Sequence, residues 1–149
     1  MEKTIYIENQ EAMSLLAKKI AKTMFDGFVI CLSGDLGAGK TTFTQYLGRH
    51  LGIKDPINSP TFTIMKMYEH TPKLTHIDAY RLEHQGDDSD IEEFIGGEGV
   101  TVIEWYPYIH SALPKHYLAM DIEWLGETKR KILVKGTGRY EKTVKILNH

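Results

Sequence analysis

The stretch "FVICLSGDLGAGKTTF", from Phe28 to Phe43, decides the fold predicted for this chain. It opens with the apolar run "FVICLS", and continuous rather than alternating apolarity is typical of a parallel strand that is covered on both faces. A glycine-rich loop, "GDLGAG", follows this run. The next residues, Thr41 to Leu51, predict a helix that ends before Gly52. A strand, a glycine loop and a helix in this order indicate an α/β fold.

Periodicity outside this stretch predicts further strands and helices. The segment "TIYIE" (4–8) alternates as a strand does, and residues 9–24 follow a helical period with Asn9 as the candidate N-cap. The apolar side of that helix is expected to consist of Ala12, Leu15, Leu16, Ile20 and Met24. The other expected elements are strands at 62–69, 74–78 and 100–105, a short helix at 91–94, and an antiparallel hairpin of 116–125 with 129–135. Together they predict a three-layer α/β sandwich similar to P-loop NTPases, with a mainly parallel central sheet and antiparallel additions that include the C-terminal hairpin.

The bulk composition is that of an ordinary globular protein. The chain has 149 residues, which suits one domain over 1–149, and its hydrophobic fraction is 42%. A net charge of -2, from 18 basic and 20 acidic residues, argues against strong binding of RNA or DNA by this chain alone. Cys31 is the single cysteine, so no internal disulfide is expected. Neither a signal peptide nor a membrane span is recognisable, and the predicted location is cytoplasmic.

The glycine loop carries a phosphate-binding pattern. Residues 34–41, "GDLGAGKT", match the Walker A pattern G-x-x-x-x-G-K-[ST], and a place between a strand and a helix is the context that this pattern requires. Glycines let backbone N–H groups approach phosphate oxygens, and the positive end of the following helix adds to the attraction. We expect Lys40 to reach the β- and γ-phosphates, Thr41 to bind Mg²⁺ through its hydroxyl, and Thr42 to donate to the α-phosphate.

Two carboxylates, a threonine and a tryptophan are further candidates. Asp78 ends "LTHID" and Glu104 ends "VTVIE", so both could reach the carboxyl edge of a parallel sheet, where ligands bind. Either could instead cap a turn or a helix, and which of the two is the principal acid stays open. Thr61 lies where nucleotide-sensing switch segments occur, although Ser59-Pro60 could simply form a turn. Trp105 is either a core aromatic residue, the commoner role, or a surface contact.

Four ordered motifs give the chain a family resemblance. They are "GDLGAGKTTF", "SPTF", "HIDAYRL" and "IEW", which follow one another between Ser33 and Trp105. In this order, and in so short a chain, they resemble the TsaE family, small bacterial ATPases required for making threonylcarbamoyladenosine (t6A) in tRNA. The N-terminal strand and helix and the C-terminal hairpin also fit the layout of that family, by pattern only.

The resemblance implies a role for each matching residue. The residues that would wrap the phosphates are Gly37, Ala38, Gly39, Lys40, Thr41 and Thr42. Thr41 and Glu104 would bind Mg²⁺. The catalytic set would be Lys40, Asp78 as the Walker B acid, Glu104, and Thr61 as the switch threonine. Trp105 would be a functional contact near the nucleotide, and Gln10 would lie near the adenine.

The family also implies an activity and partners. The chain would be a Mg-dependent ATPase with ATP and Mg²⁺ as cofactors and a low intrinsic rate that partners stimulate. Those partners would be TsaB and TsaD, with ATP hydrolysis resetting their complex, and tRNA would be contacted mainly through that complex, away from any membrane. Two other functions stay open. One is a small-molecule P-loop kinase, which usually needs a lid rich in arginine, and the other is a nucleotide-sensing module with negligible hydrolysis.

Overall fold

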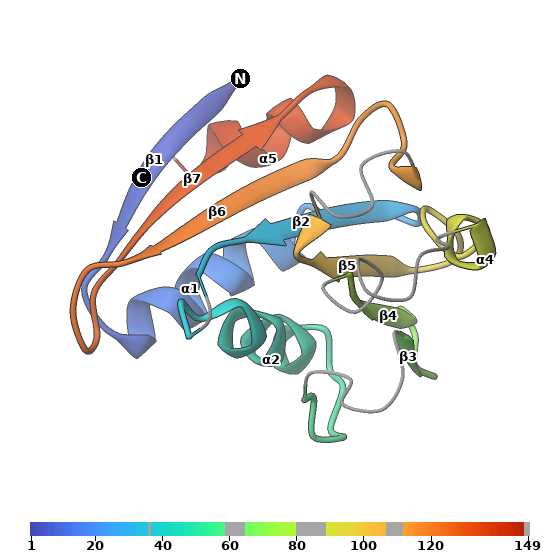
Figure 1. Ribbon diagram of the computed structural model, residues 1–149, viewed down its shortest axis with the longest axis horizontal. Coiled ribbons are helices and arrows are strands. Elements are labelled where there is room, and N and C mark those ends of the chain that lie inside the picture. Colours follow the sequence, from blue (N-terminus) through green and yellow to red (C-terminus); the bar gives the residue numbers. More distant parts are fainter. Residues whose placement is uncertain (36, 59–64, 80–88, 107–111, 148–149) are drawn as a thin grey trace.

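The protein is built on one seven-stranded sheet within the part of the chain that the structure, a computed structural model, describes: residues 1–35, 37–58, 65–79, 89–106 and 112–147 (Figure 1). The strands are β1 (Glu2–Ile7), β2 (Phe28–Ser33), β3 (Met65–Tyr68), β4 (Leu74–Asp78), β5 (Val100–Glu104), β6 (Leu118–Trp124) and β7 (Arg130–Gly136). The helices described with them are α1 (Gln10–Ala21), α2 (Lys40–His50), α4 (Ser89–Glu92), the 3-10 helix η2 (Gly138–Tyr140) and α5 (Glu141–Ile146).

The sheet is parallel at its centre and antiparallel at both sides, in the order β1-β7-β6-β2-β5-β4-β3. β2 lies between β5 and β6 and runs parallel to both, and β4 runs parallel to β5. β3 is antiparallel to β4, β7 is antiparallel to β6, and β1 pairs antiparallel with β7. The predicted α/β fold, with its mainly parallel centre and its C-terminal hairpin of β6 and β7, is confirmed.

β2 forms the centre of the core. Phe28, Val29, Ile30, Cys31 and Leu32 are all fully buried. Successive side chains of a strand point to opposite faces of the sheet. Phe28, Ile30 and Leu32 therefore join one hydrophobic cluster, while Val29 and Cys31 join a second cluster on the other face. Burial on both faces explains why this run is continuously apolar.

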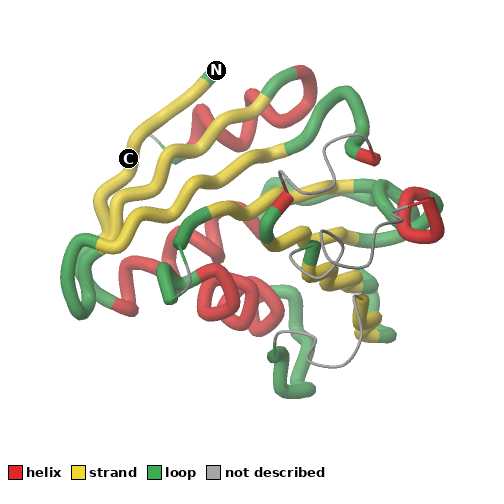
Figure 2. Tube along the Cα trace, viewed as in Figure 1, coloured by secondary structure: helices red, strands yellow, loops and turns green. Residues whose placement is uncertain are grey.

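The helices cover the two faces unequally. α1, α2 and α5 all contribute buried side chains to the cluster that contains Phe28. Figure 1 and Figure 2 show α1 and α2 side by side against this face of the sheet. On the opposite face, the described residues that pack against Val29 include Ile91 of α4 and Ala112. None of the described helices has the length and apolarity needed to cross a membrane.

α1 begins where it was predicted to begin, because the Asn9 side chain accepts a hydrogen bond from the backbone N–H of Ala12 at 2.8 Å. Its buried face differs from the prediction. Leu15 is 51% exposed, so its placement in the core was wrong, whereas Met13 and Ala17 are buried. The buried positions of α1 follow a 3.6-residue period, and Leu15 lies off that stripe, on the solvent side of the helix.

The C-terminal elements η2 and α5 were not predicted from the sequence. Tyr140, the last residue of η2, is buried, and its ring packs against Phe25 and Phe28. Its hydroxyl oxygen accepts a hydrogen bond from the Val29 backbone N–H at 2.9 Å. The ladder between β2 and β6 begins only at Ile30. The tyrosine hydroxyl therefore gives the start of the central strand a partner that β6 does not reach.

We expect Tyr140→Phe to lower the free energy of unfolding by about 1–3 kcal/mol, because the buried Val29 N–H loses its acceptor while the ring packing is kept. Urea unfolding followed by circular dichroism measures this loss. Tyr6→Phe is the matched control, since it removes a hydroxyl from a side chain that is 62% exposed. Equal stability of the two variants would show that the hydrogen bond to Val29 contributes nothing.

Candidate functional site

Three glycines in the loop between β2 and α2 have left-handed backbone conformations. Gly34, Gly37 and Gly39 have φ angles of 141°, 82° and 116°, which residues with side chains rarely adopt. A Cβ atom at Gly34 would also overlap the backbone carbonyl oxygen of Ile122 in β6. The glycines are thus explained by left-handed backbone and by the close passage of a neighbouring strand.

Lys40, the first residue of α2, is held beneath this loop. Its Nζ donates to the carbonyl oxygens of Gly34 and Asp35 at 2.6 and 2.9 Å, and the side chain is buried. Burial lowers the pKa of the Lys40 ammonium, although the nearby carboxylates of Glu104, Asp35 and Asp78 oppose that shift. A desolvated cation at the start of a helix is positioned to attract an anion strongly.

Thr41 and Glu104 meet at the start of α2. The Thr41 hydroxyl donates to Oε1 and Oε2 of Glu104 at 3.2 and 3.3 Å. Glu104 ends β5 and is only 3% exposed. On its other side, Glu104 Oε2 is hydrogen-bonded to Nε2 of His76, which is completely buried in β4. The carboxylate is therefore fixed between a hydroxyl from α2 and an imidazole from the neighbouring strand.

Asp78 lies at the end of the adjacent strand. β4 and β5 are parallel, and Asp78 and Glu104 are direct partners in their register. Both carboxylates therefore reach the same carboxyl edge of the sheet, as their positions in the sequence indicated. The Asp78 side chain is half-buried, and its charge acts on Lys40.

Trp105 covers the ammonium group of Lys40. Its ring centroid lies 3.9 Å from Lys40 Nζ, within the range of a cation–π contact. Trp105 has a φ angle of 62°, a left-handed conformation that is a genuine outlier for a bulky residue. Its backbone N–H donates to the carbonyl oxygen of Leu32 at 2.8 Å, which ties this turn to the end of β2. The ring also packs against the cluster that contains Val29, as expected for a core aromatic residue, and its predicted contact near the nucleotide stays a prediction.

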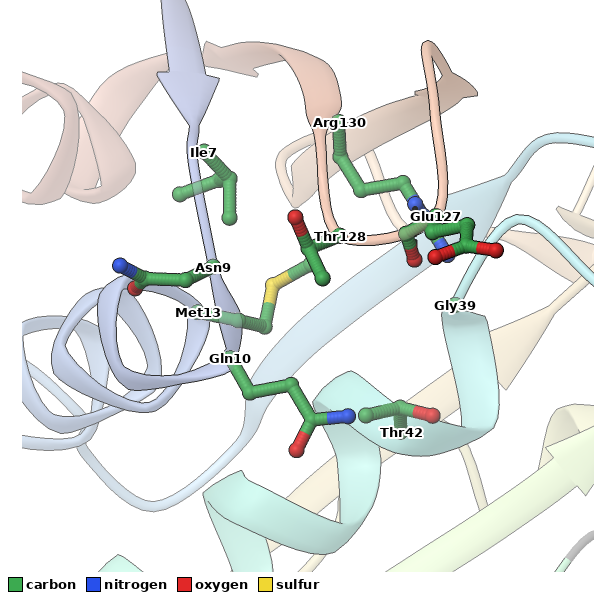
Figure 3. Close-up of a pocket in the computed structure, with 9 residues that line it drawn as sticks. All are labelled: Ile7, Asn9, Gln10, Met13, Gly39, Thr42, Glu127, Thr128 and Arg130. Atoms are coloured by element: carbon green, nitrogen blue, oxygen red, sulfur yellow. Dashed lines mark hydrogen bonds between the residues drawn. The ribbon is translucent and has the colours of Figure 1, made fainter.

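A pocket of about 70 Å³, partly open to solvent, adjoins the loop (Figure 3). It is lined by Ile7, Asn9, Gln10, Met13, Gly39, Thr42, Glu127, Thr128 and Arg130. Figure 3 shows the Gln10 side chain extending from the start of α1 toward Thr42 on α2. The Gln10 amide oxygen accepts a hydrogen bond from the Tyr46 hydroxyl at 3.3 Å. The pocket therefore brings Gln10 together with two residues of the predicted phosphate-binding segment, Gly39 and Thr42.

The residues found at the site differ in part from the site residues predicted from the sequence. Thr61 lies outside the described residues, so the predicted switch threonine stays a prediction. His76 and Arg130, which both contact the site, were not predicted as site residues. His76 lies within the "HIDAYRL" motif, two residues before Asp78. Alternate residues of a strand lie on the same face of the sheet, so this spacing is the feature of the sequence that places His76 beside the site.

The donor set at Thr41 and Glu104 fits Mg²⁺ together with phosphate. Within the described residues there is no cluster of three or more His, Cys, Asp or Glu side chains that could hold a metal ion alone. Mg²⁺ usually retains water and is held by one or two carboxylates plus substrate phosphates, rather than by an all-protein cage. A hydroxyl and a carboxylate in contact beside Lys40 match that mode of binding.

We expect Trp105→Ala to reduce about tenfold the ATP hydrolysis that the family resemblance implies, because the ring that shields and orients the Lys40 ammonium is lost. Trp105→Phe keeps an aromatic face over Lys40 and should retain most of the rate. Thermal unfolding of both variants measures the packing contribution separately. If the rate falls only in proportion to the loss of folded protein, Trp105 serves the core alone.

Comparisons with known proteins identify the family of this chain. The family model described as "Threonylcarbamoyl adenosine biosynthesis protein TsaE" matches residues 7–132. The tRNA threonylcarbamoyladenosine biosynthesis protein TsaE of Bacillus subtilis is 42% identical over 135 residues, which cover 89% of this chain and 85% of that protein. The protein of the same name from Aquifex aeolicus is 41% identical over 135 residues, covering 89% of this chain and 95% of that protein.

A solved structure is similar over nearly the whole chain. The crystal structure of Bacillus subtilis YdiB superposes with a TM-score of 0.83 at 34% identity, covering 99% of this chain and 94% of that one. The residues matched by the family model include the loop, β4 and β5, where Lys40, His76 and Glu104 lie. This chain therefore belongs to the TsaE family.

Proposed function

We propose that this chain is a Mg-dependent ATPase that supports tRNA threonylcarbamoyladenosine biosynthesis by driving turnover of the TsaB–TsaD complex. The observation that carries the ATPase part is the contact of the Thr41 hydroxyl with the buried Glu104 carboxylate, directly beside Lys40. A phosphate-binding loop alone indicates nucleotide binding. A buried acid against the threonine of that loop supplies what hydrolysis needs in addition.

The triphosphate would lie along the loop and the start of α2. Backbone N–H groups of Gly37, Ala38 and Gly39 would donate to phosphate oxygens, with Thr42 as a further hydroxyl donor. Lys40 would neutralise the negative charge that grows on the transferred phosphoryl group. This arrangement is supported by the buried position of Lys40, because electrostatic stabilisation is strongest where water is excluded.

Thr41 and Glu104 would hold Mg²⁺, which would supply positive charge to offset the negative charge of the phosphates. Glu104 is kept in place by His76, so its carboxylate needs no reorganisation on binding. Asp78, at the same edge of the sheet, is the second acid available to orient the attacking water. We assign Asp78 that orienting role because it is the less buried of the two carboxylates and can reach solvent.

The nucleoside part would occupy the pocket of Figure 3. Gly39 and Thr42 belong both to this pocket and to the phosphate-binding segment, so a nucleotide could extend from one to the other without a break. Gln10 contributes an amide whose oxygen is engaged by Tyr46, which leaves its NH₂ group to donate to a base nitrogen. Apolar surface for the ring comes from Ile7 and Met13.

The role in t6A biosynthesis rests on the family. The curated relatives carry that process in their names, and this chain covers 85% and 95% of the two described above. The near-neutral charge of -2 is in keeping with a chain that meets other proteins and reaches tRNA through them. TsaB and TsaD are therefore the partners we propose.

The test is the rate of ATP hydrolysis by the chain alone and with TsaB–TsaD from the same organism, each with and without tRNA. We expect a low rate alone and a clear increase with the complex. ATP binding without stimulation would reject the partner assignment and leave a nucleotide-binding protein. Transfer of phosphate to a small acceptor, in amounts equal to the ATP consumed, would establish a kinase instead.

A further inference from the structure

The turn between β6 and β7 forms one wall of the pocket in Figure 3, and a single side chain fastens it. Arg130, the first residue of β7, donates from Nη1 to the carbonyl oxygens of Gly126 at 2.7 Å and Lys129 at 2.9 Å, with a longer contact to Glu127 at 3.4 Å. A guanidinium group that collects several carbonyls of one turn fixes the conformation of that turn.

The same guanidinium also contacts the phosphate-binding loop. Arg130 Nε donates to the carbonyl oxygen of Ala38 at 2.7 Å. It passes so close to Gly39 that a Cβ there would lie 3.7 Å from Nε. Arg130 therefore joins two segments that are about ninety residues apart in the chain, the loop after β2 and the turn after β6.

The other ties of this turn are weaker. Thr128 Oγ1 donates to the Glu8 carbonyl oxygen at 3.0 Å, and Lys129 pairs with the Glu8 carboxylate at 3.7 Å, with both charged side chains more than 60% exposed. Exposed ion pairs contribute little to stability, whereas half-buried hydrogen bonds from a charged donor contribute more. The position of the turn over the loop thus depends mainly on Arg130.

We propose that Arg130 is a positioning residue for the nucleoside part of the nucleotide: it locks the β6–β7 turn against the phosphate-binding loop, so that the base pocket is formed before ATP binds. This inference rests on the proposed ATP site. The Nε and Nη1 groups of Arg130 donate to backbone carbonyl oxygens, so Arg130 acts through the turn and the loop that it joins. A pocket that is already formed requires no ordering of the turn on binding, which raises affinity.

The inference separates two parts of the affinity. ATP uses both the loop and the pocket, whereas inorganic tripolyphosphate has no base and uses the loop alone. Removing the hydrogen bonds of Arg130 should therefore weaken the binding of ATP more than the binding of tripolyphosphate. We expect Arg130→Gln to reduce the preference for ATP over tripolyphosphate about tenfold, the equivalent of one charged hydrogen bond.

The experiment is isothermal titration calorimetry of the full chain with Mg·ATP and with Mg·tripolyphosphate, for wild type, Arg130→Gln, Arg130→Lys and Lys131→Gln. Lys131→Gln is the matched control, because it removes one positive charge from the next residue of β7, which points to the opposite face of the sheet. Arg130→Lys keeps the charge but cannot reach Ala38 and the turn together, so it should behave like Arg130→Gln.

Three results would overturn the proposal. An unchanged preference for ATP over tripolyphosphate in Arg130→Gln would show that Arg130 does not shape the pocket, even if the melting temperature falls. A normal preference in Arg130→Lys would show that only the charge matters. Equal losses in Arg130→Gln and Lys131→Gln would show an effect of net charge. Failure of the wild type to bind ATP would be a different result, since it would reject the proposed function itself.

Discussion

Lys40→Ala is expected to lower the rate of ATP hydrolysis by about 100-fold or more, both for the chain alone and with its partners present. The side chain is a buried cation held against the described part of the phosphate-binding loop, with Nζ within 2.9 Å of two loop carbonyls. Alanine removes the positive charge that faces the phosphates. Since that charge interacts most strongly with the developing transition state, the maximal rate should fall more than nucleotide affinity.

The fold should not suffer from this change. Burial lowers the pKa of Lys40 below its ordinary value of 10.5, so keeping the ammonium charged in the folded protein opposes folding. Because the unfolded chain binds this proton more tightly, wild type should gain stability relative to Lys40→Ala as the pH rises from the lowered pKa toward 10.5.

Single-turnover hydrolysis, ATP titration and thermal unfolding together test this prediction. Lys54→Ala is the control, since Lys54 is exposed on the loop after α2 and its removal changes the net charge equally. A Lys40→Ala protein that hydrolyses ATP at the wild-type rate would contradict the assignment of the loop as a catalytic P-loop. A variant that simply unfolds would give Lys40 a structural role instead.

Glu104→Gln is expected to reduce hydrolysis about 100-fold while changing ATP affinity much less. Glutamine has nearly the same shape, so it can still accept the Thr41 hydroxyl and still fill the space beside His76. It lacks the negative charge that would hold Mg²⁺. The concentration of Mg²⁺ required for half-maximal activity should therefore rise as well.

Titration of Mg²⁺ at saturating ATP, compared with binding of ATP measured by calorimetry, separates these effects. Glu123→Gln provides the control, because it removes a carboxylate from an exposed position on β6. Losses of equal size in binding and in hydrolysis would make Glu104 a binding residue. An unchanged requirement for Mg²⁺ would remove Glu104 from the proposed metal site.

The parts of this protein that could be predicted from the sequence depend on residues that are close together in the chain. The strand Phe28–Ser33, the loop and the following helix appear in one continuous stretch, so their pattern was readable directly. The place of Asp78 and Glu104 at the carboxyl edge of the sheet also followed from two strands ending in acids. These features need only local periodicity and the rule that parallel strands share a carboxyl edge.

The parts that could not be predicted depend on contacts between distant segments. Arg130 contacts Ala38 because β6 and β7 continue the sheet on the far side of β2, an order that periodicity does not reveal. Tyr140 is needed because β6 starts one residue too late to pair with Val29. The contacts of both residues depend on how the strands are ordered and paired, and this pairing register is fixed only when the whole sheet is assembled.

The pairing of β1 with β7 has a consequence for the order in which the protein matures on the ribosome. Glu2 pairs with Lys135, so the first strand stays without its partner until the seventh strand has been translated. At common elongation speeds, on the order of ten seconds separate the two strands. Arg130 and the turn it fastens emerge in the same late interval, long after Lys40. A nascent chain thus carries its phosphate-binding loop well before it can complete a nucleotide site.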